Sequence, residues 1–163
     1  MNYATTANFL PLYSPATSSG QALNQSSAKM LVSWNPISKL VLLSLMDSLS
    51  SVGAFEANWD GQGSKKPDAL AVARAKILIE DVYNQVESLS YSTGDIWFSP
   101  HISASGEGEI VFEWWKDEFK LTIYVGSTGS EYIKVWGSDI FTQMEDGVLA
   151  GSQFQGLWLW LNS

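Results

Sequence analysis

Cysteine is absent from the 163 residues, and histidine and arginine each occur once, as His101 and Arg74. Without thiols, the chain has no disulfide framework, thiolate metal site or cysteine nucleophile. A single histidine excludes metal sites built from several imidazoles. Any Ser/His/Asp triad would depend on His101, which has no nucleophile motif beside it. We therefore predict a protein that is not an enzyme and that uses neither a metal nor a cofactor.

Long apolar runs are missing as well. The most apolar stretch, residues 40–46, is far shorter than the roughly 20 residues that span a bilayer. No basic residue precedes Lys29, so the amino terminus does not have the pattern of an export signal. Together with the lack of cysteine, these features predict a cytoplasmic protein that does not enter the membrane.

Positive charge is scarce in the second half of the chain. The formal net charge is −8, and residues 80–146 contain three lysines against thirteen carboxylates. An acidic surface repels the phosphate backbone, so we expect no direct binding to nucleic acid. The charge favours a protein partner with a basic surface. The alternative is that it serves only solubility.

The chain is predicted to have a polar arm followed by one domain. Residues 1–30 are rich in Ser, Thr, Asn, Gln and Ala and offer few core side chains, which is typical of a flexible arm. The single domain then occupies residues 31–163. Within it, apolar residues recur at steps of three and four over 36–52 and over 67–89, so we expect two helices, each beginning at a proline.

After Gly94 the apolar period shortens from helical spacing to two, which predicts an antiparallel meander. The expected strands are residues 96–98, 109–115, 119–125 and 131–137. Residues 142–161 return to helical spacing, but three glycines interrupt them, so we expect a broken, Trp-rich helical segment. The predicted fold is α+β, with two helices packed on a four-stranded sheet and the tail across an edge or the second face.

The strongest turn signal links the two predicted helices. Asn58 and Asp60 can accept hydrogen bonds from nearby backbone, and Gly61 and Gly63 can adopt positive φ. We expect a structural corner in which Trp59 inserts between helix and sheet. A calcium loop is the functional alternative, but the twelfth position counted from Asn58 is Ala69 rather than the glutamate of an EF-hand.

Two motifs resemble those of a family of small uncharacterised bacterial and phage-type proteins. One is the turn Asn-Trp-Asp-Gly-x-Gly before a helix that begins with proline. The other is the strand Gly-Glu-Ile-x-Phe-Glu-Trp at residues 108–114. The resemblance covers roughly residues 56–136. It implies a regulator, antitoxin or inhibitor from an accessory or mobile-element setting, and it implies no particular activity.

Charged and aromatic side chains alternate with core side chains along the second predicted strand. Glu109, Glu113 and Trp115 share one face of it, while Trp114 points to the other. Glu109 and Glu113 lie about 13 Å apart along a strand, too far for the carboxylate pair of a glycosidase. Trp115 with neighbouring carboxylates instead resembles an interface anchor with an acidic rim. Alternatively, the tail covers this face.

We therefore predict an acidic, non-catalytic binding protein that occupies a basic site on a protein partner, such as a nucleic-acid-handling effector. Inhibitor, antitoxin and phage-type anti-defence protein are variants of this role. The predicted partner-binding residues are Glu109, Glu113, Trp115, Tyr124, Glu131 and Trp136. The main alternative is a structural or assembly subunit that forms a homo-oligomer through the same aromatic face. An enzyme comes third and would require a deep pocket that gathers His101 with carboxylates.

Overall fold

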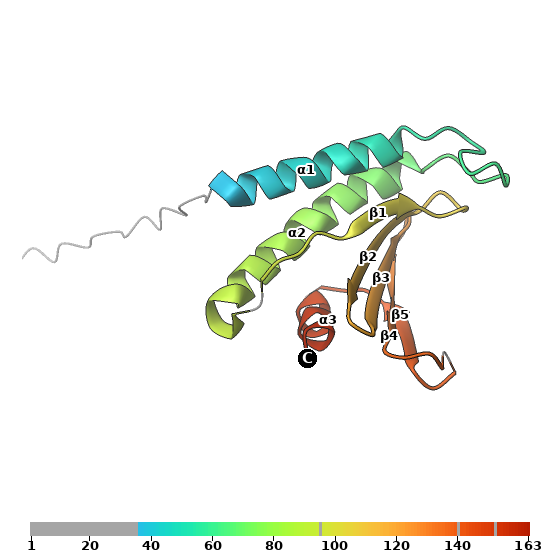
Figure 1. The fold of residues 1–163 in the computed structure, drawn as a ribbon. Coiled ribbons are helices and arrows are strands. Elements are labelled where there is room, and N and C mark those ends of the chain that lie inside the picture. The colour runs from blue at the N-terminus through green and yellow to red at the C-terminus, as the bar shows by residue number, and fades with distance from the viewer. Residues whose placement is uncertain (1–35, 95, 140, 152) are drawn as a thin grey trace, which may run out of the picture. The chain divides into compact units, whose positions relative to one another are not determined.

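Three helices and five strands are present in the computed structural model, which describes residues 36–94, 96–139, 141–151 and 153–163 (Figure 1). The elements are α1 (Pro36–Gly53), α2 (Ala69–Thr93), β1 (His101–Ala104), β2 (Ile110–Lys116), β3 (Phe119–Val125), β4 (Ser130–Val135), β5 (Met144–Val148) and α3 (Gln153–Leu161). They all belong to one compact unit, Trp34–Ser163. The predicted arm, residues 1–30, lies outside the described residues.

The strands form one antiparallel sheet in chain order, β1-β2-β3-β4-β5. The α+β class and the meander are confirmed. The predicted number of strands is wrong, because the described residues form five rather than four. Besides the two predicted helices, the predicted Trp-rich carboxyl-terminal segment forms the helix α3. Residues 96–98 form no strand, and the first strand is β1 instead. Residues 142–161, expected to form a broken helical segment, contain the strand β5 before α3.

Helix α2 follows closely from local sequence signals. The side chain of Asp68 accepts hydrogen bonds from the backbone N–H groups of Leu70, at 2.8 Å, and Ala71, at 3.1 Å, and so caps the amino-terminal end. At the other end Gly94 adopts a left-handed conformation with φ 78°. Between the caps, the stripe that faces the core is fully buried, with Ala71, Ala75, Ile79, Val82 and Val86 at most 1% exposed.

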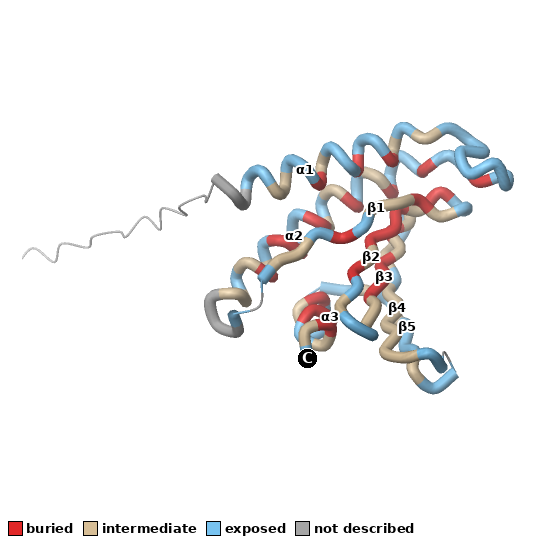
Figure 2. The backbone as a smooth tube through the Cα atoms, viewed as in Figure 1, coloured by how far each residue is buried: buried red, intermediate tan, exposed pale blue. Residues whose placement is uncertain are grey.

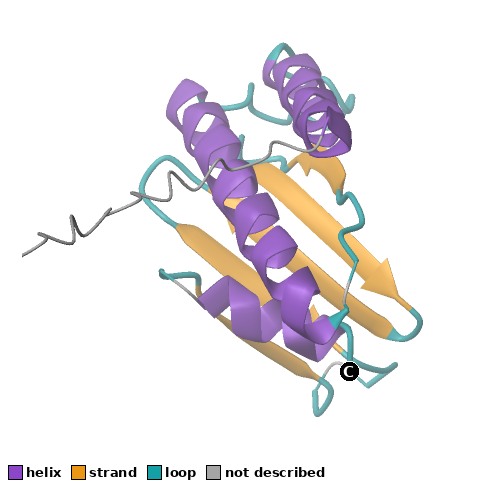
Figure 3. Ribbon diagram, turned by 90° about the vertical axis from the view of Figure 1, so that its left-hand side faces the viewer, coloured by secondary structure: helices purple, strands orange, loops and turns teal. Residues whose placement is uncertain are grey.

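All three helices lie on one face of the sheet. In Figure 3, α2 and α3 cross in front of the strands, and α1 packs against α2 and β1. The tail was expected across an edge or on the second face. The structure instead places α3 beside α2, because Phe154 and Trp158 are buried in the same core. Figure 2 shows the buried segments running along the strands and the helix sides that face them.

An aromatic cluster fills the core beneath α3. The ring of Trp158 stacks on Trp97 at a centroid distance of 5.6 Å and meets the edge of Trp114 at 6.5 Å, and Phe154 lies 5.7 Å from Trp114. Trp114 and Trp158 are at most 1% exposed. Offset and edge-to-face packing of this kind stabilises beyond the area it buries. Much of the tryptophan content is therefore explained by the core.

The second face of the sheet has no helix over it among the described elements. In Figure 1 the helices all lie to one side of the strands. We call this uncovered surface the open face. Among the described helices, none has the length and apolar character needed to cross a membrane.

Candidate functional site

The open face carries the alternate residues of every strand, and the pairing register sets them in rows across the sheet. One row is Trp115, Lys120, Val135 and Met144; the next is His101, Glu113, Thr122, Ile133 and Asp146; a third is Ser103, Val111, Tyr124, Glu131 and Val148. Five of the six predicted partner-binding residues therefore share this face: Glu109, Glu113, Trp115, Tyr124 and Glu131. The face membership follows from the two-residue period of a strand.

Strand β2 separates the adjacent tryptophans as expected. Trp114 is 1% exposed and points toward the helices, whereas Trp115 is 50% exposed on the open face. The tail does not cover Trp115, because α3 packs on the opposite side of the sheet. An exposed indole on a flat strand surface is therefore available for contact.

The end of the face around Trp115 is electrically balanced. Glu113 Oε1 lies 2.6 Å from Lys120 Nζ, and Glu113 Oε2 lies 3.3 Å from His101 Nδ1. Lys120 Nζ also sits 5.2 Å from the centroid of the Trp115 ring, and His101 lies 6.0 Å from the same ring. Glu113 was expected to offer a free negative charge at the rim. In the structure that charge is paired with Lys120, whose ammonium also lies over the Trp115 ring.

The other end of the face is an acidic groove of about 430 Å³. It is lined by Glu109, Tyr124, Glu131, Tyr132, Ile133, Met144, Asp146, Gly147 and Val148. Within the described residues no lysine, arginine or histidine forms an ion pair with the three carboxylates that line the groove, Glu109, Glu131 and Asp146. Asp146 was missed at the sequence level because its segment was expected to be helical.

The two ends are well separated. Trp115 and Glu131 lie two strands apart laterally and four residues apart along the strands. At 4.8 Å between strands and 3.4 Å per residue, their backbones are about 17 Å apart. The expected arrangement, an aromatic anchor ringed by carboxylates, is therefore replaced by an aromatic end and an acidic end on one face.

Trp136 does not join the open face. Its ring lies 6.2 Å from Trp160, and Trp160 in turn meets Phe119 at 5.3 Å, so Trp136 packs on the side of the sheet that carries α3.

Lys134 Nζ lies 5.2 Å from the centroid of the Trp160 ring and pairs with Glu145 at 2.8 Å. The Lys134 ammonium and the Tyr132 hydroxyl together lower the pKa of Glu145.

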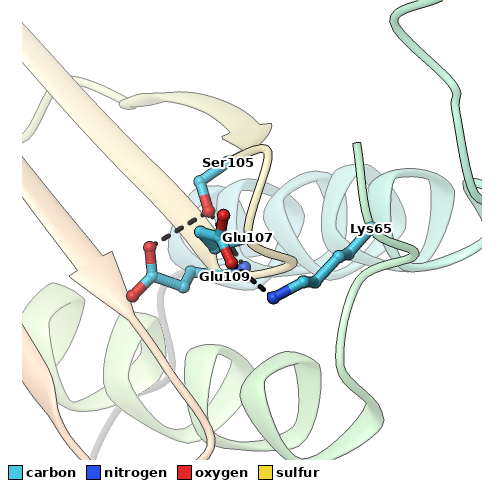
Figure 4. A network of polar contacts seen from close by, with 4 residues as sticks. All are labelled: Lys65, Ser105, Glu107 and Glu109. Carbon is cyan, nitrogen blue, oxygen red and sulfur yellow. Dashed lines mark hydrogen bonds and ion pairs between the residues drawn. The ribbon is translucent and has the colours of Figure 1, made fainter. Parts of the chain in front are cut away.

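The hairpin turn that joins β1 to β2 orients Glu109. Ser105 Oγ donates a hydrogen bond to Glu109 Oε2 at 3.0 Å and accepts one from the Glu109 backbone N–H at 3.1 Å (Figure 4). Lys65 and Glu107 form an ion pair across the same turn, which raises the pKa of Lys65 and lowers the pKa of Glu107. The Lys65 backbone N–H also donates to Gly106 O at 2.8 Å, so the segment before α2 braces the turn.

The turn between α1 and α2 is closed by its own polar groups. Gly63 N–H donates to Asn58 Oδ1 at 2.7 Å, and Gln62 N–H donates to Asp60 Oδ1 at 2.8 Å. The second bond is the main reason that the pKa of Asp60 is lowered. Asn58, Gly61 and Gly63 all have positive φ, at 64°, 73° and 88°.

Trp59 lies elsewhere than expected. Its ring stacks on Phe55 at 5.2 Å and remains 38% exposed, so it does not insert between helix and sheet. The turn holds its shape through backbone hydrogen bonds rather than through a buried indole. Among the described residues, Trp59 and Trp115 are therefore the indoles with the greatest exposure.

Within the described residues no group of three or more His, Asp or Glu side chains has the geometry of a metal site.

Comparisons with protein-family models, curated proteins and solved structures find no match. The family resemblance stays a prediction. Function must therefore be inferred from the geometry and charge of the site rather than from the fold.

Proposed function

We propose that the protein is a non-catalytic binding protein whose open face occupies a basic site on a protein partner. One observation carries the proposal: three carboxylates without a cationic partner line a groove on a sheet face that no described helix covers. Charge of one sign gathered in a concave site attracts the opposite charge and speeds association. Phosphate backbones are repelled by the same field, so a protein is favoured over nucleic acid.

The groove has the chemistry of a receptor for lysine or arginine side chains. Tyr124 lies directly across from Glu131 on the neighbouring strand, and the backbone position of Glu109 is diagonal to Tyr124. Carboxylate oxygens accept charge-assisted hydrogen bonds from guanidinium or ammonium groups, and a tyrosine ring attracts a cation over its face. Ile133 and Val148 line the same groove and can contact the apolar stem of such a side chain.

Trp115 supplies a second contact for the same partner. It is half exposed, and Lys120 and His101 flank its ring. Tryptophan is enriched among residues whose truncation costs most binding energy. Since this indole and the groove are about 17 Å apart, a partner that touches both must cover most of the face. Nucleic-acid-handling effectors present basic surfaces of that size, so an inhibitor or antitoxin role is the form of the proposal we favour.

The test is a matched pair of charge reversals. Glu131→Lys with Asp146→Lys reverses the groove, whereas Asp47→Lys with Glu80→Lys makes the same change in net charge on exposed positions of α1 and α2. Cross-linked partners are captured from a native lysate at low and high salt and quantified for each variant. We expect the groove variant to lose basic partners that the helix variant keeps, and high salt to weaken the wild-type complex.

Two outcomes would count against the proposal. Equal loss in both variants would mean that net charge alone governs capture and that the groove has no role. A salt-insensitive homo-oligomer as the only complex would favour the alternative, an assembly subunit that self-associates through its aromatic face. Circular dichroism on both variants checks that each remains folded.

A further inference from the structure

Strand β5 is a free edge of the sheet. It is last in the strand order and pairs only with β4 among the described strands. Leu149 N–H donates to Ser130 O at 2.8 Å, and Gln143 O accepts from Trp136 N–H at 3.1 Å. In an antiparallel ladder the residues alternate between bonding to the partner strand and pointing away from it. Residues 144, 146 and 148 therefore direct their N–H and C=O groups outward.

The same three residues place their side chains on the open face. Met144 is paired with Val135 and Val148 with Glu131, and both Met144 and Val148 line the groove with Asp146. Met144 is 42% exposed and Val148 is 66% exposed. The acidic groove thus reaches the unpaired edge, where backbone donors and acceptors are available next to the carboxylate of Asp146.

We propose that β5 receives an extended basic segment of the partner, which adds a sixth strand to the sheet and places a lysine or arginine side chain in the groove. This inference rests on the proposed function and specifies how the partner binds. An added strand would lie about 4.8 Å beyond β5 and twice that distance from β4, so a basic side chain on its open-face side is within reach of Asp146 and Glu131.

Charge at the centre of the strand selects the occupant. If a second copy paired antiparallel along the full length of β5, Asp146 would face Asp146 of that copy, and like charges directly opposite each other destabilise a strand pair. In the same pairing Met144 would contact Val148, which does not oppose association. The Asp146 carboxylate is therefore the group that disfavours self-association. A basic residue opposite Asp146 turns the same position into an attraction.

The opposite edge does not offer this combination. Strand β1 has four residues, His101, Ile102, Ser103 and Ala104, and no carboxylate among them. Helix α1 packs beside it. Of the two edge strands, β5 is therefore the one that joins unpaired backbone groups to uncompensated negative charge.

The test uses a nine-residue peptide that alternates lysine with threonine. One control replaces each lysine by glutamate. A second control keeps the lysines but carries N-methyl groups on the amides that would bond to β5, so that it keeps its charge and cannot pair. Amide chemical shifts and hydrogen exchange are recorded for the full chain. We expect the lysine peptide to slow exchange at residues 144, 146 and 148 by about tenfold at saturation.

The controls separate this inference from the proposed function. If both lysine peptides shift the signals of Tyr124 and Glu131 equally and the β5 amides stay unprotected, strand addition is overturned while an acidic binding face stands. If neither lysine peptide shifts the groove signals, both proposals fail. Protection that appears without peptide and grows with protein concentration would assign the edge to a second copy.

A variant tests the selecting role of Asp146. Asp146→Val removes the like charge from an exposed edge position, and we expect the variant to dimerise in sedimentation equilibrium and to show a weaker preference for the lysine over the glutamate peptide. Asp146→Asn serves as the control that keeps the side-chain shape. If the valine variant stays monomeric with unchanged peptide preference, the charge argument is overturned.

Discussion

Two buried tryptophans of the core should respond differently to the same truncation. Trp114 and Trp158 are at most 1% exposed and lie in one aromatic cluster. Trp114 Nε1 donates a hydrogen bond to Phe98 O at 3.1 Å. Trp158 Nε1 is buried and has no acceptor within the described residues. Replacing each indole by phenylalanine removes a similar volume but has opposite effects on hydrogen bonding.

The difference in cost can be worked out from these contacts. The cavity term is similar in Trp114→Phe and Trp158→Phe, so it largely cancels in the comparison. Trp114→Phe loses a hydrogen bond worth about 1 kcal/mol, whereas Trp158→Phe removes an unsatisfied donor whose burial costs about 1 to 3 kcal/mol. We therefore expect Trp114→Phe to be the more destabilising of the two by about 2 to 4 kcal/mol.

Urea unfolding followed by far-ultraviolet circular dichroism measures both free energies without relying on tryptophan fluorescence. Trp115→Phe is the surface control and should change the free energy of unfolding by less than about 0.5 kcal/mol. Equal costs for the two core variants, or a larger cost for Trp158→Phe, would refute the reasoning. Equal costs would mean that a buried water satisfies Trp158 Nε1.

Three further outcomes are expected. Gly108→Ala should lower the free energy of unfolding, measured in urea, by about 2 kcal/mol or more, because Gly108 has φ 88° and an added Cβ would lie 2.7 Å from a backbone carbonyl oxygen. Gly106→Ala is the control and should be near neutral, because the space at its Cβ is open. The Lys134 ammonium and a tyrosine hydroxyl lower the pKa of Glu145. The stabilisation that this carboxylate provides is therefore present above the ordinary glutamate pKa and is lost as pH falls through the lowered pKa of the folded state. Glu145→Gln should flatten this acid-side slope when the free energy of unfolding is measured against pH. Trp115→Ala should weaken the partner complex by about 2 kcal/mol or more in titration calorimetry, and loss of folding instead would show that this indole is structural.

Regular periodicity made most of the fold predictable. The two long helices and strands β2, β3 and β4 follow apolar repeats of 3.6 or 2 residues and lie within a few residues of their predicted bounds. The failures have a common cause. Trp97 and Phe98 are aromatic and apolar, which favours a strand, yet they reach the core from a segment outside the ladder. Strands β1 and β5 are edge strands, where polar residues are tolerated and alternation is weak.

The candidate site was likewise predictable in part from the sequence. Which residues share a face was predictable, because strand alternation fixes it from the sequence alone. The pairing of Glu113 with Lys120 and His101 was not, because it depends on the cross-strand register. That register separates the aromatic end from the acidic end. Asp146 belongs to the site because its segment forms the strand β5, which the sequence did not predict.

Because the helices cover only one face of the sheet, the residues of each strand fall into two sets, one that packs against the helices and one that faces away from them. In β2, Ile110, Phe112 and Trp114 are committed to the core, whereas Glu113 and Trp115 face outward and leave the helices untouched. A lineage built on this scaffold could change its choice of partner by replacing Glu113 or Trp115 without altering the core, whereas Val111 and Thr122, which are buried on the same face, would be retained. Divergence among descendants of such a chain would then be concentrated at the exposed positions of the open face.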